Sequence, residues 1–216
     1  MRISAVIFDL DGTVLDNEDE YGIAFRRVLN SLGKKVDKKY PHVGGIGVKE
    51  NWPLLLSKYR IQTKKSIEEL TRETQDYYLK MLDHVTYKKG FENFVRDLRN
   101  SGIATALATS NTWWIVDEVS RVFDIDSHFD IITTGEEVKY KKPDSDLFLL
   151  TSQKLGVDPS DCLVMEDSQA GIEAARRAGM KAVGIAKDIS VEKLLADADL
   201  VIFDFDQISA EEISKL

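Results

Sequence analysis

Apolar segments that recur along the chain constrain its fold more than any other feature. Continuous apolar segments without polar alternation are typical of strands in a parallel sheet that is covered on both faces. Six such segments span residues 3–8, 103–108, 129–133, 163–165, 182–185 and 200–203. From about residue 100 onward they alternate with helical patterns, which favours right-handed crossovers. The sequence therefore predicts an α/β fold with a doubly wound parallel sheet and a site beyond the carboxyl ends of its strands.

Helix-start signals support this alternation. Asp144, which follows Pro143, precedes an apolar helical segment, and Ser168 precedes an alanine-rich one. Ser209 and Glu212 have the spacing of a capping box before the last helix. We therefore expect helices directly after the later strands.

The segment between about residues 16 and 86 interrupts the alternation of strands and helices, because it contains only helix-like patterns. Apolar residues share one helical face around Tyr21 and Phe25, and again after a possible capping box of Ser66 and Glu69. The glycine-rich stretch 44–47 between them matches neither a dinucleotide fingerprint nor a phosphate loop. This segment is therefore predicted to be a helical insertion in the α/β domain.

Composition narrows the class of protein. The 216 residues are 43% hydrophobic and 31% charged, and no apolar run approaches the ~20 residues of a membrane span. The net charge of −8 argues against general nucleic-acid binding, which needs a basic face. Cys162 is the only cysteine and lies in an apolar segment, so it is expected to be a buried, inert thiol. With no signal-peptide pattern after Met1, we expect a cytoplasmic protein without membrane or nucleic-acid partners.

Asp9 and Asp11 carry the strongest chemical signal. They follow the first apolar segment two positions apart, and Gly12 allows a turn that lets both carboxyl groups face one point. One of two adjacent acids can act as an ionised nucleophile or metal ligand while the other donates and accepts a proton. Two aspartates that cap loop amides are the alternative explanation.

Three other predicted strand ends supply complementary groups. Thr109, Ser110 and Asn111 end a strand with a hydroxyl and helix-entry amides, which can bind phosphoryl oxygens. Lys142 adds a cation before a helix, and Glu166-Asp167 follow a further strand. Four acidic groups at one sheet edge would repel one another unless a cation joined them, and carboxylate oxygens suit Mg²⁺. The combination predicts a magnesium site.

These motifs resemble the haloacid dehalogenase superfamily, specifically its phosphatases with a helical cap inserted after the first strand. Asp9 to Thr13 match the first motif, Thr109 the second, Lys142-Pro143 the third and Glu166-Asp167 the fourth, in the family's order. The resemblance covers nearly the whole chain. It implies a Rossmann-like catalytic core of residues 1–15 and 87–216 and a small all-helical cap domain of residues 16–86.

The resemblance also implies a reaction: Mg²⁺-dependent hydrolysis of a small phosphate monoester through an aspartyl-phosphate intermediate on Asp9. Asp11 would protonate the leaving group and then activate water. The Asp9 carboxylate, the Asp11 backbone carbonyl and Asp167 would bind Mg²⁺, and Glu166 would place water beside the metal.

Substrate binding is expected from both parts of the chain. Thr109, the Ser110 amide and Lys142 would hold the phosphoryl oxygens, with Asn111 in the same turn. The cap would present Tyr21 and the loop of residues 44–49, which includes Gly45, to a small phosphorylated metabolite. A sugar phosphate, phosphoglycolate and a nucleotide are the candidates. The three histidines, His42, His84 and His128, lie in no recognised motif and are expected to be loop or satisfied surface residues.

Several alternatives stay open. The family's sugar-phosphate mutases carry a histidine in the first cap helix where this chain has Tyr21, which favours hydrolysis over a phosphoglucomutase-type isomerase. The presence of Asp11 argues against a dehalogenase, and a phosphonate hydrolase would need a cap lysine such as Lys49. A receiver-like signalling domain would be shorter and lack the insertion. A phosphoryl-binding protein without turnover is the last alternative, and the sequence leaves the oligomeric state open.

Overall fold

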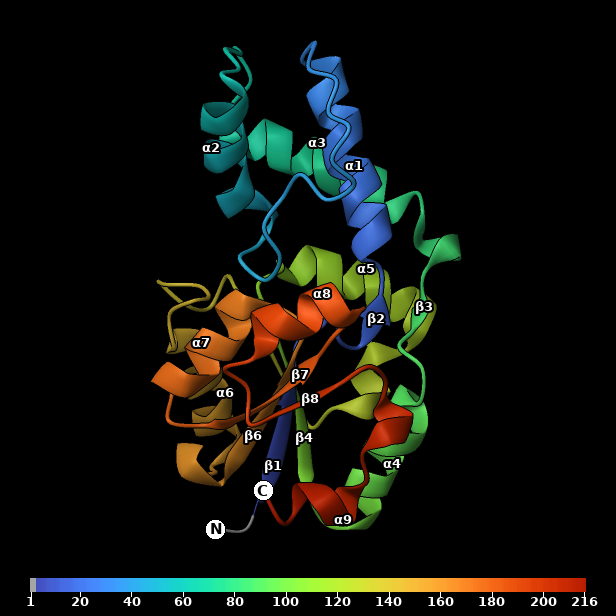
Figure 1. Ribbon diagram of the computed structural model, residues 1–216, viewed down its shortest axis with the longest axis vertical. Coiled ribbons are helices and arrows are strands. Elements are labelled where there is room, and N and C mark those ends of the chain that lie inside the picture. Colours follow the sequence, from blue (N-terminus) through green and yellow to red (C-terminus); the bar gives the residue numbers. More distant parts are fainter. Residues whose placement is uncertain (1–2) are drawn as a thin grey trace.

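The computed structural model describes residues 3–216, and its main element is a six-stranded, wholly parallel sheet. The strands lie in the order β5-β4-β1-β6-β7-β8 (Figure 1). They are β1 (Ala5–Phe8), β4 (Ala104–Thr109), β5 (Ile131–Thr134), β6 (Cys162–Glu166), β7 (Lys181–Ile185) and β8 (Leu200–Ile202). Each predicted strand is present, with ends that agree with the prediction to within two residues. The doubly wound α/β fold is confirmed.

Helices cover both faces of the sheet. The chain forms α4 (Phe91–Asn100), α5 (Trp113–Phe123), α6 (Asp146–Leu155), α7 (Gln169–Arg177), α8 (Ile189–Glu192) and α9 (Ala210–Ile213). Side chains of β1 alternate between two cores, because successive residues of a strand point to opposite faces. Phe8 packs in the core that includes Phe91 of α4, whereas Ile7 packs in the core that includes Phe148 of α6. A sheet buried on both faces explains why its strands are apolar throughout.

A small helical cap stands beyond the carboxyl ends of the central strands (Figure 1). It consists of α1 (Glu18–Ser31), α2 (Val48–Tyr59) and α3 (Ile67–Leu79), and α3 packs on the other two. The predicted capping boxes of Ser66 with Glu69 and of Ser209 with Glu212 are both formed. The cap is thus confirmed, whereas its boundaries at residues 16 and 86 stay a prediction. Met1 and Arg2, assigned to the core from sequence, lie outside the described residues.

Two features of the insertion differ from the sequence prediction. β2 (Leu15–Asp16) and β3 (Thr86–Tyr87) pair antiparallel where the chain enters and leaves the cap, although only helices were expected there. Two-residue strands are too short to give a periodic pattern. Helix α2 was not predicted, since Pro53 lies inside it and proline usually ends a helix. Among the described residues, no helix is both long and apolar enough to cross a membrane.

Candidate active site

The central strands bring the predicted motifs together at one edge of the sheet. β1 pairs with β4 on one side and with β6 on the other. Asp9 follows β1 directly, Thr109 is the last residue of β4 and Glu166 is the last residue of β6. Neighbouring parallel strands end at the same edge of the sheet, so Thr109 and Glu166 lie beside Asp9 although they follow it by 100 and 157 positions. All three residues are buried, between 0% and 4% exposed.

Lys142 joins two of these strand ends. Its ammonium group donates to Asp9 Oδ1 and lies 2.7 Å from Glu166 Oε1. The Lys142 side chain is completely buried, so both carboxylates balance its charge. Glu166 Oε2 accepts hydrogen bonds from the backbone and the hydroxyl of Ser168, both at 2.8 Å. Since both oxygens of Glu166 are occupied, its contacts here position Lys142, and its predicted role beside a metal ion stays a prediction.

Asp11 is held by two amide side chains. Its Oδ1 accepts a hydrogen bond from Asn17 Nδ2 at 2.6 Å, and its Oδ2 accepts one from Asn111 Nδ2 at 2.7 Å. Asn17 also accepts from the Gly12 backbone at 3.0 Å and donates to the Tyr78 hydroxyl at 2.7 Å. These contacts fix the direction of both Asp11 oxygens before any substrate binds.

Burial controls the proton affinity of the acids. Removal from water raises the pKa of Asp9 to about 8, against the opposing effect of the Lys142 ammonium group. Burial also raises the pKa of Asp11 to about 6, although hydrogen bonds from Asn17 and Asn111 act to lower it. Burial, followed by the charge of Glu166, raises the pKa of Asp167 well above its usual range. Acids in such surroundings suit either proton transfer or a bound cation.

The second predicted motif contacts both Asp11 and the cap. Thr109 Oγ1 accepts a hydrogen bond from the Asn111 backbone at 3.2 Å, which closes the turn after β4. The Ser110 hydroxyl donates to the Gly45 carbonyl at 2.7 Å. The hydroxyl of Tyr21 lies 3.5 Å from Asn111 Oδ1. The structure therefore brings Tyr21 and Gly45 of the cap to the strand-end residues with which they were predicted to act.

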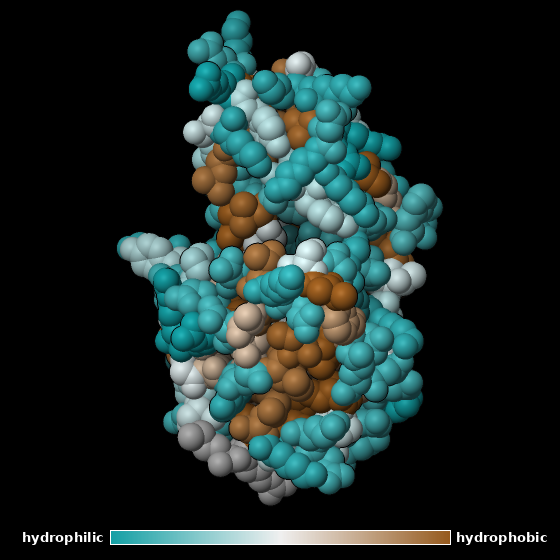
Figure 2. Space-filling model, viewed as in Figure 1, coloured by the Kyte–Doolittle hydropathy of each residue, from teal (hydrophilic) through white to brown (hydrophobic). Residues whose placement is uncertain are grey.

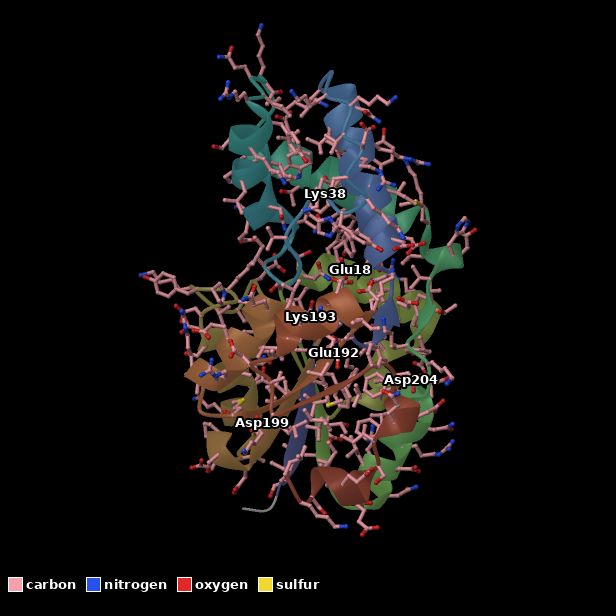
Figure 3. The ribbon with its side chains drawn as sticks, in the orientation of Figure 1. Glu18, Lys38, Glu192, Lys193, Asp199 and Asp204 are labelled. Carbon is pink, nitrogen blue, oxygen red and sulfur yellow. The ribbon has the colours of Figure 1, made fainter. Side chains whose placement is uncertain are left out.

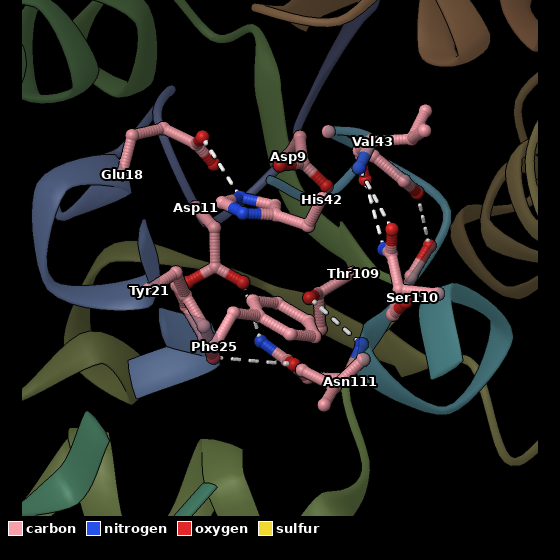
Figure 4. Close-up of a pocket in the computed structure, with 15 residues that line it drawn as sticks. Asp9, Asp11, Glu18, Tyr21, Phe25, His42, Val43, Thr109, Ser110 and Asn111 are labelled. Carbon is pink, nitrogen blue, oxygen red and sulfur yellow. Dashed lines mark hydrogen bonds and ion pairs between the residues drawn. The ribbon is translucent and has the colours of Figure 1, made fainter. Parts of the chain in front are cut away.

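Two cavities lie where cap and core meet. The smaller one, of about 40 Å³, is lined by Asp9, Asp11 and the Thr109 turn together with cap residues (Figure 4). The larger one, of about 730 Å³, contains Gly12, Asp167 and Ser168 in its wall. Lys49, considered above as a cap lysine for phosphonate chemistry, lines neither cavity; it pairs with Glu68 at 3.0 Å and is 55% exposed.

The residues fit a magnesium ion in part. The Asp167 side chain has no hydrogen-bond or ion-pair partner among residues 3–216. Its carboxylate lies against Gly12, since a Cβ added to that glycine would be only 2.0 Å from Asp167 Oδ2. An unpartnered, partly buried carboxylate near Asp9 is suited to a hard cation. Within the same described residues, no three His, Cys, Asp or Glu side chains form a metal-binding group. The predicted set of magnesium ligands needs only two carboxylate side chains, those of Asp9 and Asp167, because Asp11 would contribute its backbone carbonyl.

Three residues of the site were not predicted from the sequence. Asn17 is completely buried and contacts Asp11. Tyr78 of α3, which is 61 residues further along the chain, contacts Asn17 through its hydroxyl. His42 was expected to be a loop or surface residue; its side chain lies in a loop but is only 5% exposed and lines the smaller cavity. His42 thus lies in a loop, as expected, but its side chain is buried in the site and not at the surface. The position of Asn17 soon after Asp11 could have drawn attention to it, whereas Tyr78 and His42 gave no signal.

Comparison with known proteins agrees with this geometry. Residues 6–185 match the family model described as haloacid dehalogenase-like hydrolase. A phosphorylated carbohydrates phosphatase of Thermotoga maritima is 31% identical over 202 residues, covering 92% of this chain and 93% of that protein. A β-phosphoglucomutase of Bacillus subtilis is 29% identical, covering 93% and 89%. A crystal structure of β-phosphoglucomutase from Clostridium difficile has a TM-score of 0.87 at 28% identity, covering 99% of this chain and 96% of that one.

This protein belongs to the haloacid dehalogenase-like hydrolases. The prediction of a family member with a helical cap is confirmed, as is the prediction of an enzyme that hydrolyses phosphate monoesters. The family assignment also gives no support to the receiver-like alternative.

Proposed function

We propose that this protein hydrolyses a small phosphate monoester with Mg²⁺ through a phosphoryl intermediate on Asp9. The observation that carries the proposal is the arrangement of two acids with different partners. Lys142 holds Oδ1 of Asp9, and Oδ2 has no hydrogen-bond partner among the described residues. Asp11 is held by two amides with its pKa raised to about 6. One acid is thus arranged as a nucleophile and the other as a proton carrier.

The reaction has two steps. In the first, Oδ2 of Asp9 forms a bond to phosphorus while the bond to the ester oxygen breaks, and Asp11 transfers its proton to the departing alkoxide. In the second, Asp11 takes a proton from water, whose oxygen attacks phosphorus and releases phosphate and the Asp9 carboxylate. Lys142 neutralises negative charge throughout, and the Ser110 amide would hold a phosphoryl oxygen.

Mg²⁺ would supply charge neutralisation between Asp9 and the anionic phosphoryl group. Asp9, Asp167 and the Asp11 carbonyl would hold it. A location in the cytoplasm and the absence of a nucleic-acid partner stay predictions.

Hydrolysis is proposed over a mutase reaction because of Tyr21. Its ring stacks on Tyr78, with centroids 4.0 Å apart and an interplanar angle of 10°, and its hydroxyl is directed to Asn111. Tyr21 is thus held in place by packing, and burial raises its pKa well above the usual range. A mutase would convert a sugar 1-phosphate in the presence of a bisphosphate activator and release little free phosphate, and that assay decides between the two.

The proposal is tested by phosphate release from 4-nitrophenyl phosphate with Mg²⁺ or with EDTA. Chelation is expected to abolish turnover, and so is Asp9→Asn. Asp11→Asn is expected to accumulate covalent phosphate on Asp9, detectable by mass spectrometry, because the nitrophenolate leaves without a proton but the second step lacks its base. Equal rates for the wild type and Asp9→Asn would remove Asp9 as the nucleophile.

A further inference from the structure

The His42 side chain has an unusual position for a loop residue. It belongs to the cap segment between α1 and α2, yet it lies in the wall of the smaller cavity with Asp9 and Asp11 (Figure 4). Its ring stacks on Phe25, with centroids 4.7 Å apart and an interplanar angle of 17°. Its Nε2 lies 3.3 Å from Glu18 Oε2. Two residues of α1 therefore fix the orientation of the ring.

The other ring nitrogen of His42 has no partner. Nδ1 is buried and makes no hydrogen bond within residues 3–216. Leaving a buried polar atom unpaired is costly, so most such atoms are satisfied. An ionised Glu18 can only accept, which places the hydrogen of a neutral imidazole on Nε2 and leaves Nδ1 as an acceptor. The group that would satisfy Nδ1 is therefore a donor, such as a hydroxyl.

His42 stands between the phosphoryl side and the larger cavity. Glu18, His42, Val43 and Gly44 line both cavities. Figure 3 places Glu18 at the junction of cap and core, and Figure 2 shows a notch in the molecular outline between its upper, helical part and the part below. The larger cavity has a volume in the range of ~300–1,000 Å³ that is usual for small-molecule sites. An ester with its phosphate at Asp9 would place its leaving group next to His42.

Charges around the larger cavity restrict that leaving group. Its two lysines are already paired: Lys88 with Asp16 at 3.2 Å and Lys187 with Asp19 at 2.6 Å. Glu173 and Asp197 in the wall also have arginine partners, at 2.9 Å and 3.7 Å, which leaves Glu18 and Asp167 as the acids of the described wall without a lysine or arginine partner. A leaving group with its own carboxylate or phosphate would meet the charge of these two acids and no unpaired lysine in the described wall. The wall suits an uncharged, hydroxylated leaving group instead.

We propose that His42, oriented by Glu18 and Phe25, accepts a hydrogen bond from a leaving-group hydroxyl and selects monophosphates of sugars or polyols over esters without hydroxyls. The proposal rests on the phosphatase function proposed above. His42 is a specificity-determining residue in this role, while Asp9 and Asp11 carry the chemistry. Phosphoglycolate becomes the less favoured candidate, because its leaving group carries a carboxylate.

A matched pair of esters tests the proposal: D-glucitol 6-phosphate and n-hexyl phosphate have the same carbon skeleton and differ in hydroxyl groups. The wild type is expected to prefer the glucitol ester by about tenfold or more in kcat/KM, the effect of one buried hydrogen bond. His42→Gln keeps a polar group toward Glu18 but loses Nδ1, and that preference is expected to fall about tenfold. His42→Asn restores an acceptor near Nδ1 and should keep most of the preference.

His84→Gln is the control, since His84 is 69% exposed and lines neither cavity. It should retain the wild-type preference. A wild type that hydrolyses both esters equally well, or a His42→Gln variant that loses activity equally on both, would overturn the role of His42 while leaving the phosphatase in place. A wild type that releases phosphate from neither ester nor from 4-nitrophenyl phosphate would overturn the proposed function, and the inference with it.

Discussion

The core and cap sides of the site are held by contacts of different kinds. On the core side, the Lys142 side chain is 0% exposed and lies between two carboxylates that are almost fully buried. Toward the cap, Lys187 pairs with Asp19 although the two side chains are 37% and 41% exposed. Buried pairs are strongly destabilised when one partner is removed, whereas exposed pairs contribute little and exchange with water. The catalytic residues are thus held rigidly in the core, whereas the exposed ion pair between cap and core is weak enough to break when the cap opens for substrate.

Lys142→Met is expected to have the largest effect. It removes a buried cation that faces Asp9, and kcat/KM on 4-nitrophenyl phosphate should fall by about 10³-fold. It also leaves Asp9 and Glu166 without their partner, which should lower the free energy of unfolding by about 3–5 kcal/mol. Steady-state kinetics and urea denaturation measure the two effects.

Lys141→Met is the matched control. The neighbouring Lys141 pairs with Glu50 of the cap at 3.0 Å and is 18% exposed, so its loss removes a contact between cap and core but none to Asp9. A small change in KM is expected. Similar losses from both lysine variants would contradict the distinction between the two sides of the site.

Asn17→Ala should have the next largest effect, because Asn17 connects the two sides. It leaves Asp11 Oδ1 and the Tyr78 hydroxyl each without this hydrogen bond, whereas the Gly12 amide keeps its bond to the Leu15 carbonyl at 2.8 Å. With Asp11 less firmly oriented but still present, kcat should fall by roughly 10–100-fold, less than the ~10²–10⁴-fold that general acid–base catalysis typically contributes. Asn93→Ala, at an exposed residue bonded to Arg96, should leave kcat unchanged. An unaltered kcat in Asn17→Ala would show that Asn111 alone orients Asp11.

The residues of the site that could be predicted from the sequence lie on the core side, and most of those that could not lie on the cap side. Asp9, Thr109, Lys142 and Glu166 could be identified because parallel strands end at one edge, so a motif at each strand end must meet the others. The sequence alone did not show that Glu166 would bind Lys142 and Ser168 with both oxygens. That detail depends on side-chain packing rather than on topology.

The cap gave weaker signals for a physical reason. His42 enters the site because the loop between α1 and α2 folds back, and no periodic pattern specifies the path of an irregular loop. Helix α2 was hidden by Pro53, and its buried Trp52 and Leu55 show that tertiary packing outweighed the local cost of proline. Elements fixed by local periodicity were predictable, and those fixed by contacts across the chain were not.

Gly45→Ala tests how closely the cap loop must approach the core. Gly45 has a φ of +79°, and a Cβ there would lie 2.2 Å from Ser168 Oγ. Displacement of the loop should also weaken the hydrogen bond from Ser110, and we expect kcat/KM to fall by about tenfold, the effect of one lost hydrogen bond.

Gly33→Ala separates backbone strain from the close approach. Gly33 has a φ of +77°, and nothing lies within 4 Å of a Cβ there. Both variants should lose about 1–2 kcal/mol of stability from the left-handed backbone. Only Gly45→Ala should lose activity; an equal loss in Gly33→Ala would mean that strain alone, and not the approach to Ser168, is responsible.

The smallest effect is expected from Asp19→Asn, which weakens the exposed link between cap and core. Burial acts to raise the pKa of Asp19, but hydrogen bonds from Lys187, Lys39 and Tyr40 together bring the pKa below its usual range. A folded-state pKa below the unfolded value of about 3.9 stabilises the protein above that pH, and this contribution disappears as the pH falls through the folded-state pKa. Because the side chain is 41% exposed, the difference between wild type and variant at pH 7 should be at most about 1 kcal/mol and shrink in 1 M salt.

Thermal unfolding of both proteins between pH 7 and pH 3 measures this contribution. The difference in Tm should stay constant down to about pH 4 and then decrease, since only the wild type takes up a proton at residue 19. Glu68→Gln breaks a comparable pair with Lys49 inside the cap, so it should leave KM unchanged, whereas Asp19→Asn should change KM by about twofold. A Tm difference that grows on acidification would mean that Asp19 is not held by these cations, and the cap would then rest on the core through Ser110 and Asn111 rather than through surface charge.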